Sequence, residues 1–204
     1  REICDKHGIL LIFDEVITGW GRTGAPFAAQ AFGVTPDMMT MAKAITNGVV
    51  PLGAVASREE IYDTVLNASP TGAVEFFHGY TYSAIPVSMA AGLAMQDIFE
   101  KEKLFDRAKD MSPYFLDGLF SLKDLDIVVD IRGYGMMGGI DMRMDERVGK
   151  AGYACFKKLF EAGLSLKATG DCLIVAPPFV CEKKHIDEII EKLRTGISNY
   201  MKDR

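Results

Sequence analysis

Residues 9–15 have the sequence ILLIFDE, five apolar residues followed by two acids. A short unbroken apolar run is typical of an interior strand of a parallel sheet, which is buried on both faces. Two more apolar runs follow at residues 38–41 and 52–56, and Lys43 lies just beyond the first of them. We therefore predict strands at all three places, with Asp14 and Lys43 at strand ends, where open α/β sheets bind ligands.

Helices are expected between and after these strands. The pattern predicts a short helix at residues 28–32 and longer helices at 59–67 and 84–100. Ser83 is a candidate N-cap for the third helix, and Pro86 suits its first turn. Strands that alternate with helices indicate an α/β sheet layered by helices.

The second half has a different pattern, that of a smaller α+β domain with antiparallel strands. Its apolar residues recur at helical spacing from Leu104 to Leu122, although Pro113 should kink or split that helix. The other elements expected there are strands at 127–131, 140–144 and 173–175, a helix at 150–162 and a final helix from Ile186 to Met201. We place the boundary in the helix near residues 90–103, which gives domains 1–95 and 96–204.

Composition excludes several classes of protein. The 23 Lys and Arg against 28 Asp and Glu give a net charge of −5, which argues against a nucleic-acid partner. No apolar run approaches the roughly 20 residues of a membrane span. The four cysteines are too few for a disulfide framework, so we expect a cytoplasmic protein. Cys172, Cys181 and His185 match no common zinc spacing, so we expect no metal.

Residues 1–7 are typical of the last turns of a helix that Gly8 ends. They contain neither an initiator Met nor a signal-peptide pattern. We therefore expect this chain to be the C-terminal part of a longer protein.

Asp14 and Lys43 are the first candidates for a chemical role. A buried aspartate needs a cationic partner or strong hydrogen bonds. A lysine at the same edge of a sheet can lose its proton through desolvation and act as a nucleophile. The alternative is that Asp14 only caps a turn and Lys43 points into solvent, and spacing alone leaves both interpretations open.

Longer motifs resemble a known family. Residues 11–24 (LIFDEVITGWGRTG), 41–48 (MAKAITNG), 77–83 (FHGYTYS) and 170–178 (GD followed by PP) occur in the order found in class III pyridoxal-phosphate (PLP) aminotransferases. Over nearly its whole length the chain is similar to the ω-amino acid–pyruvate (β-alanine–pyruvate) transaminases. The resemblance implies the aspartate-aminotransferase-like PLP fold, with part of its large α/β domain followed by the small α+β domain.

The resemblance also implies roles for individual residues. Lys43 resembles the lysine that is attached covalently to PLP and shuttles the substrate proton. Asp14 resembles the aspartate that pairs with the pyridine nitrogen and so keeps the ring an electron acceptor. Val16 resembles a residue that packs on the ring. Thr81 resembles a threonine that contacts the cofactor phosphate of the neighbouring subunit, which implies a homodimer or a tetramer.

Lys167 departs from the family pattern. The related transaminases have an arginine there, two residues before the Thr169-Gly170-Asp171 triplet, and it binds the substrate carboxylate. Lysine keeps the charge but lacks the planar fork that binds a carboxylate through two hydrogen bonds. We expect weaker carboxylate recognition or a shift toward plain amines; the alternative is a merely solvated lysine.

The implied activity is transamination of an ω-amino acid or amine with pyruvate or another keto acid. The alternatives are another PLP reaction, such as that of an aminomutase or decarboxylase, and a non-catalytic fragment. The family's phosphate-binding cup and ring-stacking aromatic residue are not found among these residues. The resemblance therefore implies that the 204 residues alone are inactive or bind PLP weakly.

Residues 133–138 (GYGMMG) match the glycine fingerprint of dinucleotide-binding proteins. That fingerprint requires a helix directly after the loop. Because an alternating strand pattern follows here, we expect a tight connection between strands and no nicotinamide cofactor.

Overall fold

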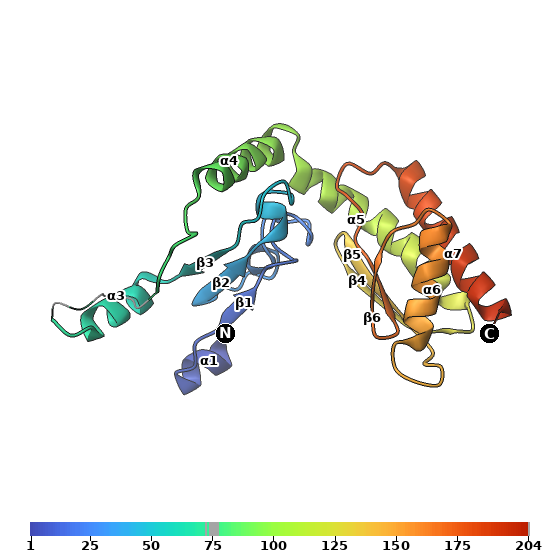
Figure 1. Cartoon of the computed structure of the whole chain (residues 1–204), viewed down its shortest axis with the longest axis horizontal. Helices are drawn as coiled ribbons and strands as arrows, with labels where there is room; N and C mark the ends of the chain where they lie inside the picture. Colours follow the sequence, from blue (N-terminus) through green and yellow to red (C-terminus); the bar gives the residue numbers. More distant parts are fainter. Residues whose placement is uncertain (72, 74–77, 204) are drawn as a thin grey trace. The chain divides into compact units, whose positions relative to one another are not determined.

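The computed structural model describes residues 1–71, 73 and 78–203 (Figure 1). The chain divides into two compact units. Unit 1 consists of Arg1–Gly21 and Ala25–Lys103, and unit 2 of Arg22–Gly24 and Leu104–Arg204. The main division along the chain thus falls after Lys103, the last residue of the region 90–103 in which the sequence pattern places the domain boundary. Among the described residues, no helix has the length and apolar character needed to cross a membrane.

Unit 1 is built around a three-stranded sheet in the order β1-β2-β3. β1 (Ile12–Asp14) pairs with β2 (Met38–Met41) in parallel, and β2 pairs with β3 (Ala54–Ser57) in antiparallel orientation. The helices are α1 (Glu2–His7), α2 (Ala28–Ala31), the 3-10 helix η1 (Lys43–Ile45), α3 (Glu59–Ala68) and α4 (Pro86–Lys101). The three predicted strands and the predicted helices are therefore present, and Gly8 ends α1 with a φ of 62°.

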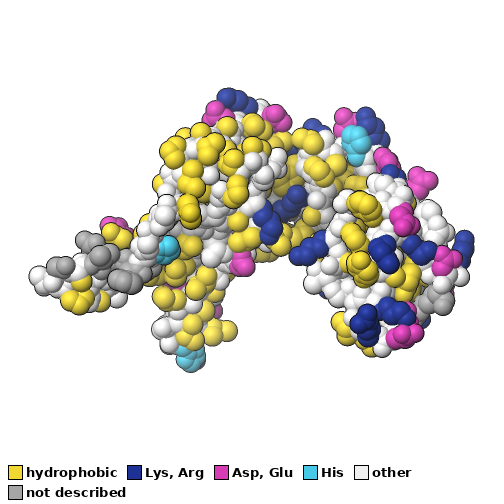
Figure 2. Space-filling view, viewed as in Figure 1, with side chains coloured by type: hydrophobic (Ala, Val, Ile, Leu, Met, Phe, Trp, Pro, Cys, Tyr) yellow, Lys and Arg dark blue, Asp and Glu magenta, His cyan; other side chains and the backbone are white. Residues whose placement is uncertain are grey.

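The prediction that residues 9–13 form a buried interior strand is wrong for this structure. β1 lies at the edge of the sheet, and Ile9, Leu10 and Ile12 are each 55% exposed. The physical reason is that the described residues supply a strand on only one side of β1, so the apolar run is not enclosed. Figure 2 shows hydrophobic side chains on the visible surface around this sheet.

The predicted N-cap of α4 is also wrong, because Ile85 and not Ser83 occupies that position. Proline disfavours helical backbone angles in the residue before it, and Ile85 has a ψ of 122°. The helix therefore begins at Pro86, as its missing N–H allows.

Unit 2 is a four-stranded antiparallel sheet in the order β4-β5-β7-β6. The strands are β4 (Val128–Tyr134), β5 (Met137–Met142), β6 (Lys167–Thr169) and β7 (Cys172–Val175). The helices are α5 (Leu104–Phe120), the 3-10 helix η2 (Ser121–Asp124), α6 (Lys150–Glu161) and α7 (Lys183–Lys202). The antiparallel α+β prediction is confirmed, and β6 is the strand that the pattern missed.

Pro113 is predicted to kink or split the helix, and the split is wrong, because α5 continues through this residue. Proline removes one backbone hydrogen bond, but Phe115 and Leu119 beyond it are fully buried in the core of unit 2. Packing of this helical face outweighs the lost bond.

Residues 133–138 span the end of β4, a tight two-residue connection and the start of β5, as predicted, and no helix follows directly. Gly135 has a φ of 62°, and a Cβ atom there would lie 2.1 Å from the Arg22 carbonyl oxygen. Only glycine combines this backbone conformation with so close an approach.

Candidate active site

The parallel pairing of β1 and β2 brings their carboxyl ends to the same edge of the sheet in unit 1. Asp14 lies opposite Thr40, whose hydroxyl donates a hydrogen bond of 3.0 Å to Asp14 Oδ1. The Val16 N–H donates to the same oxygen at 3.1 Å. Asp14 is exposed, and within the described residues its second oxygen, Oδ2, accepts no hydrogen bond. This carboxylate therefore has one oxygen fixed by the protein and one available to a ligand.

Lys43 begins η1, directly beyond the carboxyl end of β2. Its side chain is exposed, and its φ of 53° lies in the left-handed region that non-glycine residues rarely adopt. Such conformations persist only where the surrounding structure enforces them, and they cluster at functional sites. One local support is Thr46, which is buried and whose hydroxyl donates to the Val50 carbonyl at 2.6 Å.

A cavity of about 990 Å³ lies beside Lys43 within unit 1. Besides Lys43, it is lined by Trp20, by parts of residues 45–54, by residues 82–85 and by one face of α4 between Ser88 and Gln96. Asp14, Val16 and Thr81 are not among its lining residues. The described residues therefore bring Lys43 to a cavity and Asp14 with Val16 to the adjacent strand end, without enclosing all of them in one pocket.

Thr81 and Lys167 occupy different places in the chain. Thr81 is exposed in a turn before α4, and Phe77, which begins its motif, lies outside the described residues. Lys167 is the first residue of β6 in unit 2, exposed and opposite Ile174. Within unit 1, Thr81 does not join Lys43 at the cavity.

Glu15 is a residue whose role the sequence pattern did not reveal. Its side chain is fully buried and accepts hydrogen bonds from the Thr18 hydroxyl at 2.5 Å and from the Ala28 and Ala29 N–H groups at 2.9 and 2.8 Å. These N–H groups begin α2, where a carboxylate compensates both the unpaired donors and the helix dipole. Glu15 thereby anchors the backbone directly after Asp14. The donating N–H groups lie 13 and 14 residues further along the chain, so no local sequence signal identifies the contact.

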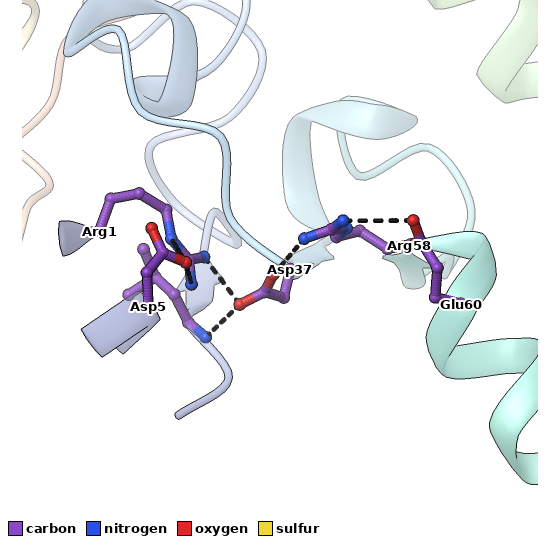
Figure 3. Close-up of polar contacts among 6 residues, drawn as sticks. Arg1, Asp5, Asp37, Arg58 and Glu60 are labelled. Carbon is purple, nitrogen blue, oxygen red and sulfur yellow. Dashed lines mark hydrogen bonds and ion pairs between the residues drawn. The ribbon is translucent and has the colours of Figure 1, made fainter. Parts of the chain in front are cut away.

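Asp37 is the second buried carboxylate of unit 1. It lies directly before the start of β2, and Figure 3 shows its contacts. It is 5% exposed and accepts hydrogen bonds from the Leu11 N–H at 2.7 Å, from Arg1 at 2.7 Å and from Arg58 at 3.0 Å. The Leu11 N–H and then the Arg1 guanidinium hold the pKa of Asp37 well below its usual range. Asp37 thus ties the approach to β1, the start of β2 and the end of β3 together.

The structure thus has an exposed lysine beside a cavity, just beyond a strand of an α/β sheet. The chain belongs to the class-III aminotransferase family, which its sequence matches over residues 1–197. Class-III aminotransferases depend on PLP, so the predicted family, fold class and cofactor are confirmed.

Particular relatives make the assignment more specific. The chain is 48% identical over 195 residues to an omega-aminotransferase of Caulobacter vibrioides and 46% identical over 202 residues to a beta-alanine–pyruvate aminotransferase of Pseudomonas aeruginosa. These alignments cover 95% and 97% of this chain but only 44% and 45% of the relatives. The chain therefore spans less than half the length of these curated relatives.

Solved structures agree with this assignment. A transaminase determined with L-alanine matches 99% of this chain and 49% of its own, with a TM-score of 0.92 and 29% identity. An (S)-enantioselective omega-transaminase from Thermomicrobium roseum matches with a TM-score of 0.88 and 36% identity, covering 98% of this chain and 45% of its own.

The residues present fit PLP chemically. Lys43 offers a primary amine beside a cavity, which a cofactor aldehyde requires. Asp14 offers a carboxylate oxygen with no partner among the described residues, which suits a protonated ring nitrogen.

Proposed function

We propose that this chain carries the lysine-bearing part of an enzyme that transfers amino groups from an ω-amino acid or amine to pyruvate or another keto acid. Family membership supports the reaction class, and the names of the relatives from Caulobacter vibrioides and Pseudomonas aeruginosa support this choice of substrates. The observation that carries the proposal is Lys43 in its left-handed conformation just beyond β2, next to the parallel strand that ends in Asp14.

Bound PLP would supply an electron-accepting ring that stabilises negative charge at the amino-bearing carbon of the substrate. Lys43 Nζ would hold the cofactor and move a proton between the amino-bearing carbon of the substrate and the cofactor. Asp14 Oδ2 would keep the proton on the ring nitrogen while Thr40 and the Val16 N–H fix Oδ1. The side chain of Val16 would form an apolar wall for the ring.

Two further residues of the proposed site bind charged groups. The Thr81 hydroxyl would donate a hydrogen bond to a cofactor phosphate in a neighbouring subunit, within a cytoplasmic homodimer or tetramer. The Lys167 ammonium would pair with a substrate carboxylate through a single charge-assisted contact, weaker than the two-pronged contact of an arginine. Amines without a carboxylate would therefore be relatively better substrates than in an enzyme with arginine there.

We further propose that these 204 residues alone form an incomplete site. Lys43, Asp14 and Thr81 do not line one cavity among the described residues, and the apolar run of residues 9–12 is exposed. Both observations fit a chain that spans less than half the length of its curated relatives. An aminomutase or decarboxylase would use Lys43 and Asp14 equally well, so product analysis has to separate these reactions.

The test is borohydride reduction after incubation with PLP, followed by peptide mass mapping. We expect a pyridoxyl group on Lys43 and none on Lys103, which is also exposed with a positive φ and so is a matched control. Lys43→Arg should abolish the label. Equal labelling of both lysines, or no label on Lys43 in a chain of the relatives' full length, would contradict the proposed cofactor site. A label on Lys43 in that longer chain but not in the 204 residues alone would support the incomplete site. Alanine formation from pyruvate and an amine donor then identifies transamination, whereas loss of carbon dioxide would indicate decarboxylation.

A further inference from the structure

β6, the strand that carries Lys167, is short and lies at the edge of the sheet in unit 2. It has three residues and pairs only with β7. Ala168 packs against the core, so Lys167 and Thr169 lie on the opposite face of the sheet. So short an edge strand has few ladder hydrogen bonds of its own to fix the direction of a side chain.

Asp171 supplies an additional attachment for this strand. It lies in the two-residue turn that joins β6 to β7, and its side chain reaches the N-terminus of α6. Oδ2 accepts a hydrogen bond of 2.8 Å from the Gly149 N–H, and Oδ1 accepts one of 3.0 Å from the Gly152 N–H. A carboxylate at this place satisfies two otherwise unpaired donors and is favoured by the helix dipole.

The backbone of α6 comes unusually close to the same turn. A Cβ atom on Gly152 would lie 2.1 Å from the Gly170 carbonyl oxygen and 2.9 Å from Asp171 Cα. Such distances require glycine at this helical position, although glycine is unfavourable within a helix. The turn is therefore seated on α6 by both backbone packing and the two hydrogen bonds.

The other cation on this part of the sheet is neutralised. Arg132 lies in the row of β-sheet partners that includes Gly139, Ile174 and Lys167. It forms ion pairs with Asp130 and Asp141. Within the described residues Lys167 forms no ion pair, so it is the cation of this row that an incoming carboxylate can engage.

We propose that Asp171 is a positioning residue for Lys167: by fixing the β6–β7 turn to α6, it holds the Lys167 ammonium in the place where it binds a carboxylate. This inference rests on the proposed role of Lys167 in substrate binding. Asp171 itself takes no part in the chemistry, because its two oxygens are occupied by α6.

The first test measures the attachment without enzyme activity. Asp171→Asn replaces one accepting oxygen by an NH₂ donor, and we expect amide hydrogen exchange in residues 166–175 to be about tenfold faster. Asp110→Asn makes the same charge change on the exposed face of α5 and should leave this exchange unchanged. Asp171→Glu keeps the charge and should give an intermediate increase in exchange. It replaces the asparagine variant in this test if that variant does not fold. Unchanged exchange in both Asp171 variants would overturn the proposal.

The second test compares β-alanine with propylamine, which lacks the carboxylate, as amino donors for the PLP-loaded enzyme. Asp171→Asn and Lys167→Met should each raise KM for β-alanine about tenfold, with kcat and the KM for propylamine unchanged. An effect of Lys167→Met alone would overturn the positioning role of Asp171. Equal KM increases for both donors in Asp171→Asn would indicate a merely structural role and would also overturn it. No effect of Lys167→Met would instead refute the proposed role of Lys167, on which the inference rests.

Discussion

Replacement of Glu15 by glutamine is the sharpest test of how unit 1 holds the backbone after Asp14. The glutamate accepts from the Thr18 hydroxyl and from two N–H groups of α2. Glutamine has one accepting oxygen, so its NH₂ group must face at least one of these donors. The variant also removes the negative charge at the helix N-terminus.

The expected loss follows from these contacts. A buried donor left unpaired costs about 1–3 kcal/mol. The loss of a helix N-cap costs about 0.5–2 kcal/mol. The two effects share the same hydrogen bonds and are not additive, so we expect Glu15→Gln to lower the free energy of unfolding of unit 1 by about 2 kcal/mol. For a domain of up to about 100 residues, this lowers the melting temperature by about 8–16 °C.

Tryptophan fluorescence measures this unit selectively. Trp20 is the only tryptophan of the sequence, and within unit 1 its ring packs on Phe99 at 6.1 Å and on Phe27 at 5.1 Å between centroids. Thermal and urea unfolding followed by this signal therefore report unit 1. Glu100→Gln on the exposed face of α4 is the matched control, with an expected change within about 0.5 kcal/mol. A shift for Glu15→Gln no larger than that of the control would refute the capping role of Glu15.

Three other predictions concern a turn, an acid and the proposed substrate site. Gly135→Ala should destabilise unit 2 by about 2–4 kcal/mol in urea unfolding, because the added Cβ would meet the Arg22 carbonyl oxygen. Gly8→Ala is the control: Gly8 has the same φ of 62° but open space around it, so the substitution should cost only about 1–2 kcal/mol. Because the pKa of Asp37 is lowered, its stabilising contribution is complete above about pH 4 and is lost as the pH falls further. The free energy of unfolding should therefore be smaller at pH 3 than at pH 5, and this difference should be smaller in Asp37→Asn. Lys167→Arg should raise kcat/KM for β-alanine about tenfold relative to propylamine, and an equal change for both donors would contradict a carboxylate contact.

The fold of unit 2 could be predicted well because its patterns are local. Alternation in residues 140–144 and helical spacing in α7 each specify one element within a short window. β6 escaped prediction because three residues give no periodicity. In unit 1 the apolar run before Asp14 predicted a strand correctly, but its burial depends on neighbouring strands that a local pattern does not specify.

The candidate site was predicted only at the level of single positions. Lys43 and Asp14 follow from motifs at strand ends, and the structure places Asp14 as the last residue of β1 and Lys43 just beyond the adjacent parallel strand β2. The contacts that support these strand ends and turns have no local sequence signal. Glu15 accepts hydrogen bonds from backbone N–H groups of a later helix, and Asp171 accepts them from backbone N–H groups of an earlier helix. Backbone donors look the same in every residue type except proline, so tertiary folding alone selects them.

The two units differ in what holds them, and this difference bears on the strand ends that carry Asp14 and Lys43. The cluster of buried apolar side chains lies entirely in unit 2. In unit 1, the described buried side chains include all four buried polar ones: Glu15, Asp37, Thr46 and Ser88. Glu15 and Thr46 are anchored directly beside the turns that follow Asp14 and Lys43. Buried hydrogen bonds are directional, whereas apolar packing tolerates small shifts, so this polar framework can fix the backbone at both strand ends more closely than an apolar core could.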